Sequence, residues 1–380
     1  MNPSEVRSLF PVMEQRAYIF SGGIAPHSTL SLAAVERFNA LLTNDPGELY
    51  RRYREEFDIV RKLFADLIGA EVDEVAVVDC TGTGSNLAVD MIDPVPGSNV
   101  VFDESAYPSA AYPWMLPPRS HVELRFVEGR DGIIHLEDMA EAIDENTIAV
   151  SVSHVSQESG FKHDLKALTE VAHAHGAALC VDAMQSAGAL DFDVHDEGVD
   201  FLATGAMKWL LGSAGVGFLY VSRDHLDKMP PHAGGPGAQP DDRPWGQREF
   251  VPRPGADRFH VGMPNLIGLA ATRPGLEVLH QVGMDVVEAH VLDLSGYCIS
   301  QLLERGLNVT TPEPAQYRAG IVSIDMGDQR SSQAADEFLT ARGVDGYHHQ
   351  NVLRVDPHIF NNRGDIDRFL SELDSYLSQH

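Results

Sequence analysis

From about residue 55 to 222 the chain alternates short apolar runs with stretches of helical periodicity. Three of the apolar runs are typical of strands: 74–80, 99–104 and 147–155. In a later unit Asp164 is placed to cap a helix, Gly176 is placed to end it, and a strand ending at Asp182 follows. Strands that alternate with helices predict an α/β fold with a largely parallel sheet.

The length of the chain and a change of pattern predict two domains. A chain of 380 residues exceeds the size at which single cores stop growing. Residues 228–257 are rich in proline and glycine and predict a long loop, after which helical and strand patterns return in a different order. We expect a large α/β domain over 16–268 and a smaller α+β domain formed by 1–15 and 269–380.

Charge and composition exclude several classes of partner. A formal net charge of -28 would repel nucleic acids and anionic membrane surfaces. The chain has no apolar run long enough to span a bilayer and its first residues do not resemble a secretory signal, so we expect a cytoplasmic location. The three cysteines form no CxxC pair, which argues against a disulfide framework and against a metal site.

One lysine stands in an unusual place. The sequence has only five lysines, and Lys208 alone lies within an apolar run, AMKWLL. A buried ammonium is unfavourable unless it is paired, neutralised or used chemically. The alternative is a lysine at the end of an element whose stem is buried while its amine reaches water.

Three polar stretches should meet at the carboxyl ends of the predicted parallel strands: TGTGSN (81–86), DAMQSAG (182–188) and TGAMK (204–208). The first, at a strand-to-helix turn, could bind a phosphate, although a plain tight turn explains it equally well. Asp182 could pair with a protonated pyridine nitrogen, or it could cap a following helix. An anion site, a carboxylate and a buried lysine are together the contacts that pyridoxal 5'-phosphate (PLP) requires.

Three longer stretches carry a family resemblance: VSHVSQESG, VDAMQSAGAL and GAMKWLLGSAGVGFLYV. With them the chain resembles the class V aminotransferase group of fold-type I PLP enzymes, which includes cysteine desulfurases, selenocysteine lyases and isopenicillin N epimerase-like proteins. The resemblance extends from Ala17 to Leu370. It implies a fold-type I PLP-dependent transferase fold, a homodimer and a small amino-acid substrate.

The resemblance also implies roles for the residues that would hold the cofactor. Lys208 would form the Schiff base and move the proton at the substrate α carbon. Asp182 would hold the pyridinium, and Gln185 would reach the phenolic oxygen. Gly82 and Thr83 would bind the phosphate.

Further residues match positions of the family pattern, and some of them have a second interpretation. Thr204 would help to bind the phosphate. Tyr107 would stack on the ring, unless it is a plain core tyrosine. Gln157 stands where the group usually has asparagine, near a substrate or cofactor oxygen.

The substrate side of the site follows from the same resemblance. Arg354 would clamp the substrate carboxylate through a bidentate guanidinium, unless it forms a surface ion pair. His348 and His349, in the same region, could serve as acid or base or could be exposed loop residues.

Two departures from the family pattern limit the reaction. Met263 stands where the family often has a threonine that reaches the phosphate of a partner subunit. The loop GVDGYHHQNVLRVD, before and around Arg354, lacks the nucleophilic cysteine of the desulfurases. We therefore expect transamination or β-elimination of the carbon–sulfur lyase type, at the α carbon of a small amino acid or an amino-acid conjugate, and not typical desulfurase activity. An epimerase of the isopenicillin N type and a non-catalytic binding protein remain alternatives.

Overall fold

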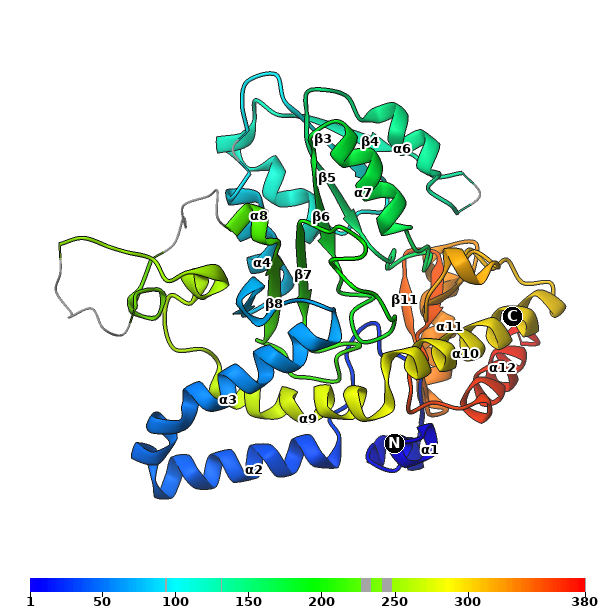
Figure 1. Cartoon of the computed structure of the whole chain (residues 1–380). Helices are drawn as coiled ribbons and strands as arrows, with labels where there is room; N and C mark the ends of the chain where they lie inside the picture. Colours follow the sequence, from blue (N-terminus) through cyan, green and yellow to red (C-terminus); the bar gives the residue numbers. More distant parts are fainter. Residues whose placement is uncertain (93, 131, 227–233, 241–247, 380) are drawn as a thin grey trace.

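A seven-stranded sheet forms the centre of the larger part of the molecule (Figure 1). The computed structural model describes residues 1–92, 94–130, 132–226, 234–240 and 248–379. The strand order is β2-β8-β7-β6-β5-β3-β4, and β8 alone runs against the others in this sheet. The strands are β2 (Val75–Val78), β3 (Asn99–Asp103), β4 (Glu123–Val127), β5 (Thr147–Ser153), β6 (Ala178–Asp182), β7 (Phe201–Gly205) and β8 (Gly217–Val221).

Both faces of this sheet are buried in its central strands, whereas the edge strand β4 is partly exposed. Successive side chains of β8 enter different cores: Phe218 and Tyr220 join one cluster, and Leu219 and Val221 join the other. Helices cover the sheet in two layers, which explains why its strands are almost continuously apolar. The helices of this part are α2 (Thr29–Asn44), α3 (Pro46–Leu67), α4 (Thr81–Asp90), α5 (Pro108–Ala111), α6 (Leu136–Ala142), α7 (Leu165–Ala174), α8 (Arg223–Leu226) and α9 (Leu266–Val282).

The C-terminal part builds a third core around an antiparallel sheet of order β11-β12-β9. Its elements are β9 (Val322–Asp325), β10 (Val344–Asp345), β11 (Tyr347–His349), β12 (Val352–Val355), α10 (Met284–Glu304), α11 (Gln329–Ala341) and α12 (Arg363–Leu377). The N-terminal segment is joined to it, because β1 (Ala17–Tyr18) pairs with β10 in parallel. None of the described helices is both long and apolar enough to cross a membrane.

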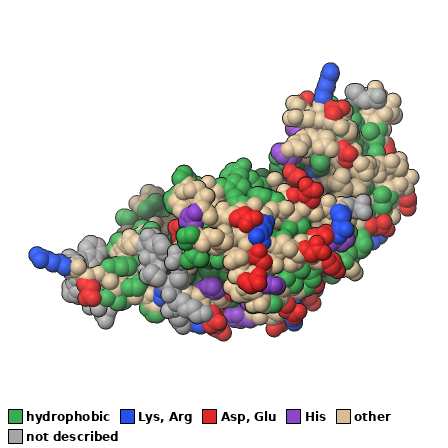
Figure 2. All heavy atoms as spheres, turned by 90° about the horizontal axis from the view of Figure 1, so that it is seen from above, with side chains coloured by type: hydrophobic (Ala, Val, Ile, Leu, Met, Phe, Trp, Pro, Cys, Tyr) green, Lys and Arg blue, Asp and Glu red, His purple; other side chains and the backbone are tan. Residues whose placement is uncertain are grey.

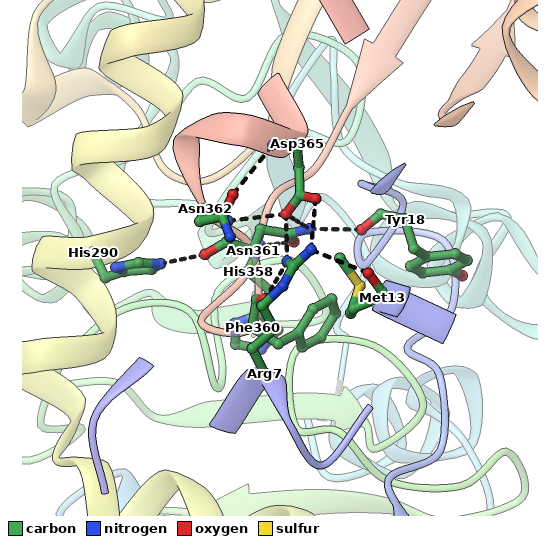
Figure 3. A network of polar contacts seen from close by, with 9 residues as sticks. All are labelled: Arg7, Met13, Tyr18, His290, His358, Phe360, Asn361, Asn362 and Asp365. Atoms are coloured by element: carbon green, nitrogen blue, oxygen red, sulfur yellow. Dashed lines mark hydrogen bonds and ion pairs between the residues drawn. The ribbon is translucent and has the colours of Figure 1, made fainter. Parts of the chain in front are cut away.

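A polar network fastens the N-terminal helix α1 (Pro3–Arg7) to this C-terminal part (Figure 3). Arg7 donates to both oxygens of Asp365 at 2.6 and 3.0 Å, and also to the carbonyl of Phe360. Asn361 donates to the carbonyl of Tyr18, beside β10. Asp365 also accepts the backbone N–H of Asn362, so one carboxylate both pairs with Arg7 and caps α12.

The predicted fold class and the predicted α/β unit are confirmed. Asp164 caps α7 by accepting the N–H of Ala167, and Gly176 has a φ of +80°, as a left-handed helix end requires. One boundary was wrong, since TGTG is no turn before a helix but the first turn of α4 itself. A Cβ on Gly84 would lie 2.9 Å from the Cβ of Ala203, so this glycine lets α4 pack directly on β7.

Two other predictions have a different standing. Much of the predicted loop 228–257 lies outside the described residues, and its last residues begin a short 3₁₀ turn, Gly255–Phe259. The division into domains at 15/16 and 268/269 stays a prediction.

Acidic side chains are spread over the face seen in Figure 2, in line with the net charge of -28.

Replacing Arg7 by methionine should lower the free energy of unfolding by about 3 kcal/mol, because it leaves the carboxylate of Asp365 buried without its cation. Chemical denaturation monitored by circular dichroism measures the change. Arg51→Met is the control, since Arg51 pairs with Glu48 on the surface and should contribute less than about 1 kcal/mol. Equal effects of the two substitutions would contradict the structural role of the network.

Candidate active site

Lys208 follows β7 in a short turn and is partly buried among apolar neighbours. Within the described residues its Nζ has neither a hydrogen bond nor a salt bridge, although Trp209 and Leu210 beside it are fully enclosed. Burial lowers the pKa of Lys208 to about 8, and the positive charge of Arg354 acts in the same direction. At pH 7 about a tenth of the amine is then free, far more than for a lysine with an ordinary pKa near 10.5, and the free amine is the form that acts as a nucleophile.

Asp182 is the last residue of β6 and is buried. Its carboxylate accepts the hydroxyl of Ser109 and, at 2.9 Å, the backbone N–H of Met184. Burial raises the pKa of Asp182, while those two hydrogen bonds and the charge of Lys208 oppose the rise. The helix-capping alternative was wrong, because turns rather than a helix follow this residue.

Gln185 lies on the turn after Asp182 and is buried. Its Nε2 donates to the carbonyl of Gly22 at 3.0 Å, and its Oε1 accepts the indole N–H of Trp209 at 2.8 Å. These bonds tie the predicted phenolic-oxygen ligand to the residue next to Lys208. One Nε2 hydrogen stays free for a ligand within this set of contacts.

The first turn of α4 offers donors for an anion. The first N–H groups of a helix have no partner within the helix, and Gly82 and Thr83 belong to this turn. A Cβ on Gly82 would meet only the sulfur of Cys80, at 3.9 Å, so there is open space before it. The Thr81 hydroxyl and the N–H of Gly205 both donate to the sulfur of Met184, which lies across the same turn.

Thr204 is the predicted phosphate contact that the structure does not bring to α4. Its neighbours Ala203 and Gly205 contact α4, at Gly84 and Thr81, and side chains alternate along a strand. The side chain of Thr204 therefore faces away from α4, and its hydroxyl lies 3.4 Å from the main-chain oxygens of Ala183 and Gly205.

Tyr107 precedes α5 at the same edge of the sheet. Its side chain is 40% exposed, so it is not a core tyrosine. The backbone N–H of Tyr107 donates to the hydroxyl of Ser153, which ends β5. This bond holds the residue close to the carboxyl end of the central strands, where a ligand ring would lie.

Arg354 lies on β12 and is buried, so the surface ion-pair alternative was wrong about its location. It does form an ion pair, with the fully buried Asp356 at 3.0 Å. Its Nη1 donates to the carbonyl of Gln157 at 2.8 Å, and its guanidinium lies 4.9 Å from the ring centre of Tyr347. Gln157 thus contacts the predicted carboxylate clamp through its main chain.

The two histidines of β11 point in different directions. His349 lines a small cavity of about 50 Å³ together with Gln157, Tyr347 and Arg354. His348 pairs instead with Asp336 of α11, at 2.8 Å. The structure brings His349 to the cavity beside Arg354 and does not bring His348 there, because neighbouring side chains on a strand face opposite sides.

The residues around Lys208 and Asp182 fit PLP. A buried carboxylate at a strand end suits a pyridinium, a free amine suits the aldehyde, and the first turn of α4 has open space and N–H donors for a phosphate.

Comparison with known proteins gives the family of the chain. Residues 27–346 match the sequence profile of the aminotransferase class-V family. The "Uncharacterized aminotransferase YcbU" of Bacillus subtilis (strain 168) is 29% identical over 376 residues, covering 98% of this chain and 97% of that protein. A "Probable cysteine desulfurase" of Halalkalibacterium halodurans is 27% identical over 409 residues and covers 98% of both chains.

The fold is shared with a solved structure. The apo structure of a cysteine desulfurase from Thermococcus onnurineus NA1 superposes with a TM-score of 0.88 at 23% identity, covering 100% of this chain and 99% of that one. The chain belongs to the class V aminotransferase family, has the fold-type I architecture and is a PLP-dependent enzyme.

Sequence reasoning missed several residues of the site. Ser109, Trp209 and Asp356 contact Asp182, Gln185 and Arg354 respectively. Asp356 alone had a usable signal, because it stands two residues after Arg354 and such residues share one face of an extended segment. The other two contacts join distant segments of the chain.

The rate at which the cofactor-free protein takes up PLP should depend on the pKa of Lys208. Below pH 8 the rate should rise about tenfold for each pH unit, and above pH 8 it should level off, because only the free amine attacks an aldehyde. Absorbance measurements follow the reaction over pH 6 to 10, about two units on either side of the expected pKa of Lys208.

Arg354→Gln serves as the comparison variant. Removing the positive charge that lowers the pKa of Lys208 should move the plateau to higher pH. A rate that continues to rise up to pH 10 in the unaltered protein, about two units above the expected midpoint, would contradict the lowered pKa.

Proposed function

We propose that this enzyme acts at the α carbon of a small amino acid or an amino-acid conjugate, by transamination or by β-elimination of the carbon–sulfur lyase type. The observation that supports this most strongly is the amine of Lys208, which has no hydrogen bond or ion pair among the described residues and is subject to the charges of both Asp182 and Arg354. Bound PLP supplies an electron sink that stabilises negative charge at the α carbon. The chain's own groups determine which bond is broken and where the proton goes.

Each group has a task in this proposal. Arg354 binds the substrate carboxylate and so fixes the orientation of the α carbon. Lys208, with a pKa of about 8, removes the α proton and delivers it again. Asp182 keeps the cofactor nitrogen protonated, and Gln185 donates to the phenolic oxygen. Tyr107 covers the ring, and Gly82 and Thr83 bind the phosphate.

The cysteines support a reaction other than desulfuration. Cys180 and Cys298 are buried, and burial raises the pKa of Cys298 to about 12. Cys80 is exposed but precedes the first turn of α4, at the phosphate end. The β11–β12 hairpin beside Arg354 has histidine and tyrosine and no cysteine. A persulfide needs a thiolate within reach of the substrate sulfur.

We further propose a homodimer and a cytoplasmic location. Exposed apolar side chains lie near the phosphate end, at Val261, Met263 and Ile267, which are 46%, 56% and 41% exposed. Met263 and Thr83 line one cavity of about 410 Å³ that a second subunit could close. The three cysteines are free, as is usual in a reducing compartment.

Product analysis tests the reaction. The protein loaded with PLP is incubated with amino acids and thioether conjugates, with and without a keto acid acceptor, and products are identified by mass spectrometry. Transamination predicts a new amino acid only when the acceptor is present, and β-elimination predicts pyruvate and ammonia without it. Alanine with a persulfide, or an inverted α carbon alone, would instead indicate a desulfurase or an epimerase.

A pair of lysine variants separates catalysis from passive binding. Lys208→Ala should lower turnover at least about 10³-fold, because no other group takes its place as base. Lys62→Ala, which removes an exposed lysine paired with Asp66 on α3, should leave turnover unchanged. Turnover that survives in Lys208→Ala would contradict the proposal, and a colourless protein that ignores PLP would favour a non-catalytic binding protein.

A further inference from the structure

The proposed carboxylate clamp already holds a carboxylate of the protein itself. Asp356 Oδ2 accepts the Nε of Arg354 at 3.1 Å and lies 3.0 Å from its Nη2. Asp356 is completely buried, and the side chain of Arg354 is 5% exposed. The other oxygen, Oδ1, has no hydrogen-bond partner among the described residues.

The backbone around Asp356 fixes this carboxylate in place. Its N–H donates to the carbonyl of Ile19 at 2.7 Å, and its carbonyl accepts the N–H of Ser21. A Cβ on Gly22 would lie 2.6 Å from Asp356 Oδ2, so the carboxylate packs against bare main chain. The main chain of Asp356 is therefore held by two hydrogen bonds, and Gly22 lies close to its carboxylate.

The contacts of Arg354 leave only one edge of the guanidinium for a ligand. Asp356 takes the Nε–Nη2 edge and Gln157 takes one hydrogen of Nη1. A guanidinium has five N–H donors, so within the described residues one hydrogen on Nη1 and one on Nη2 have no partner. Arg354 lines a cavity together with His349 and the acidic Glu158.

The charge of Arg354 is also largely offset. Burial raises the pKa of Asp356, and the charge and hydrogen bond of Arg354 oppose that rise. A guanidinium is always protonated, and at 3.0 Å it favours the ionised carboxylate, which places opposite unit charges side by side. A ligand carboxylate at the Nη1–Nη2 edge meets the attraction of Arg354 together with the repulsion of Asp356. It gains hydrogen bonds but little net Coulomb energy.

We propose that Asp356 is a specificity-determining residue that orients Arg354 through its Nε–Nη2 edge and offsets its charge, so that the site binds a single carboxylate weakly and rejects dicarboxylic substrates. This inference rests on the proposed role of Arg354 as the carboxylate clamp. The substrate is then a monocarboxylic amino acid or conjugate whose remaining groups supply most of the affinity.

Binding of small probes to the PLP-loaded protein tests the proposal without turnover. Propionate and propionamide have the same shape and differ in charge, and NMR titration gives both dissociation constants. In the unaltered protein propionate should bind no more than about threefold more tightly than propionamide, because the charges of the pair cancel. A preference of tenfold or more for propionate, about 1.4 kcal/mol, would overturn the proposal.

Substitutions of Asp356 should change the ratio of the two dissociation constants in favour of propionate. Asp356→Asn keeps the shape and a hydrogen-bond acceptor for Arg354, so the preference for propionate should rise about tenfold, with a larger gain for succinate. Asp356→Ser, a second neutral variant, should show the same sign. An unchanged or smaller preference in a folded variant would mean that Asp356 only holds Arg354 in place, which contradicts the proposal.

Two controls complete the experiment. Asp144→Asn removes a carboxylate that also pairs with an arginine, Arg125 at 2.8 Å, but lies where β3 and β5 begin, at the opposite edge of the sheet. In this variant the ratio of the dissociation constants of propionate and propionamide, the probe ratio, should equal that of the unaltered protein. Circular dichroism confirms that each variant is folded. If the PLP-loaded protein showed no turnover with any amino acid, the proposed function would fail, whereas the probe ratio would still report on Asp356.

Discussion

The site depends on a balance of four buried or partly buried charges. Lys208 and Arg354 repel each other, and burial alone lowers the pKa of Lys208. The charges of Asp182 and Asp356 oppose this effect. With both carboxylates present the pKa of Lys208 is about 8, which suits an amine that must be nucleophilic and must also carry a proton.

The four charged residues come from both parts of the molecule. Asp182 and Lys208 come from the carboxyl ends of β6 and β7, whereas Arg354 and Asp356 come from β12 and the residue after it. The N-terminal segment joins the two sets, because Gly22 contacts both Gln185 and Asp356. The network around Arg7 and Asp365 anchors this segment to the C-terminal part (Figure 3).

The part of this arrangement that follows from strand order could be predicted from the sequence. Apolar runs and helix caps gave the parallel sheet, and its topology brought Asp182 and Lys208 to one edge. Side-chain direction was harder to predict. Thr204 and His348 stand one residue from positions that face the site, and alternation along a strand turns each of them away.

Contacts between distant segments could not be predicted at all. Ser109 reaches Asp182 from another strand connection, and Trp209 reaches Gln185 only after the chain has folded back. The start of α4 was misjudged for a related reason, because glycine-rich sequence suggests a turn, whereas Gly84 serves close packing on Ala203. Each of these contacts depends on which residue packs against a position in the folded chain. The local sequence around that position does not identify the packing partner.

The central claim is that the amine of Lys208 forms the covalent bond to the cofactor. Borohydride reduction of the PLP-loaded protein, followed by proteolysis and mass spectrometry of the peptides, tests it most directly. The account predicts a pyridoxyl group on the peptide that contains Lys208 and on no other lysine. A label on a different lysine, or no label at all, would contradict it.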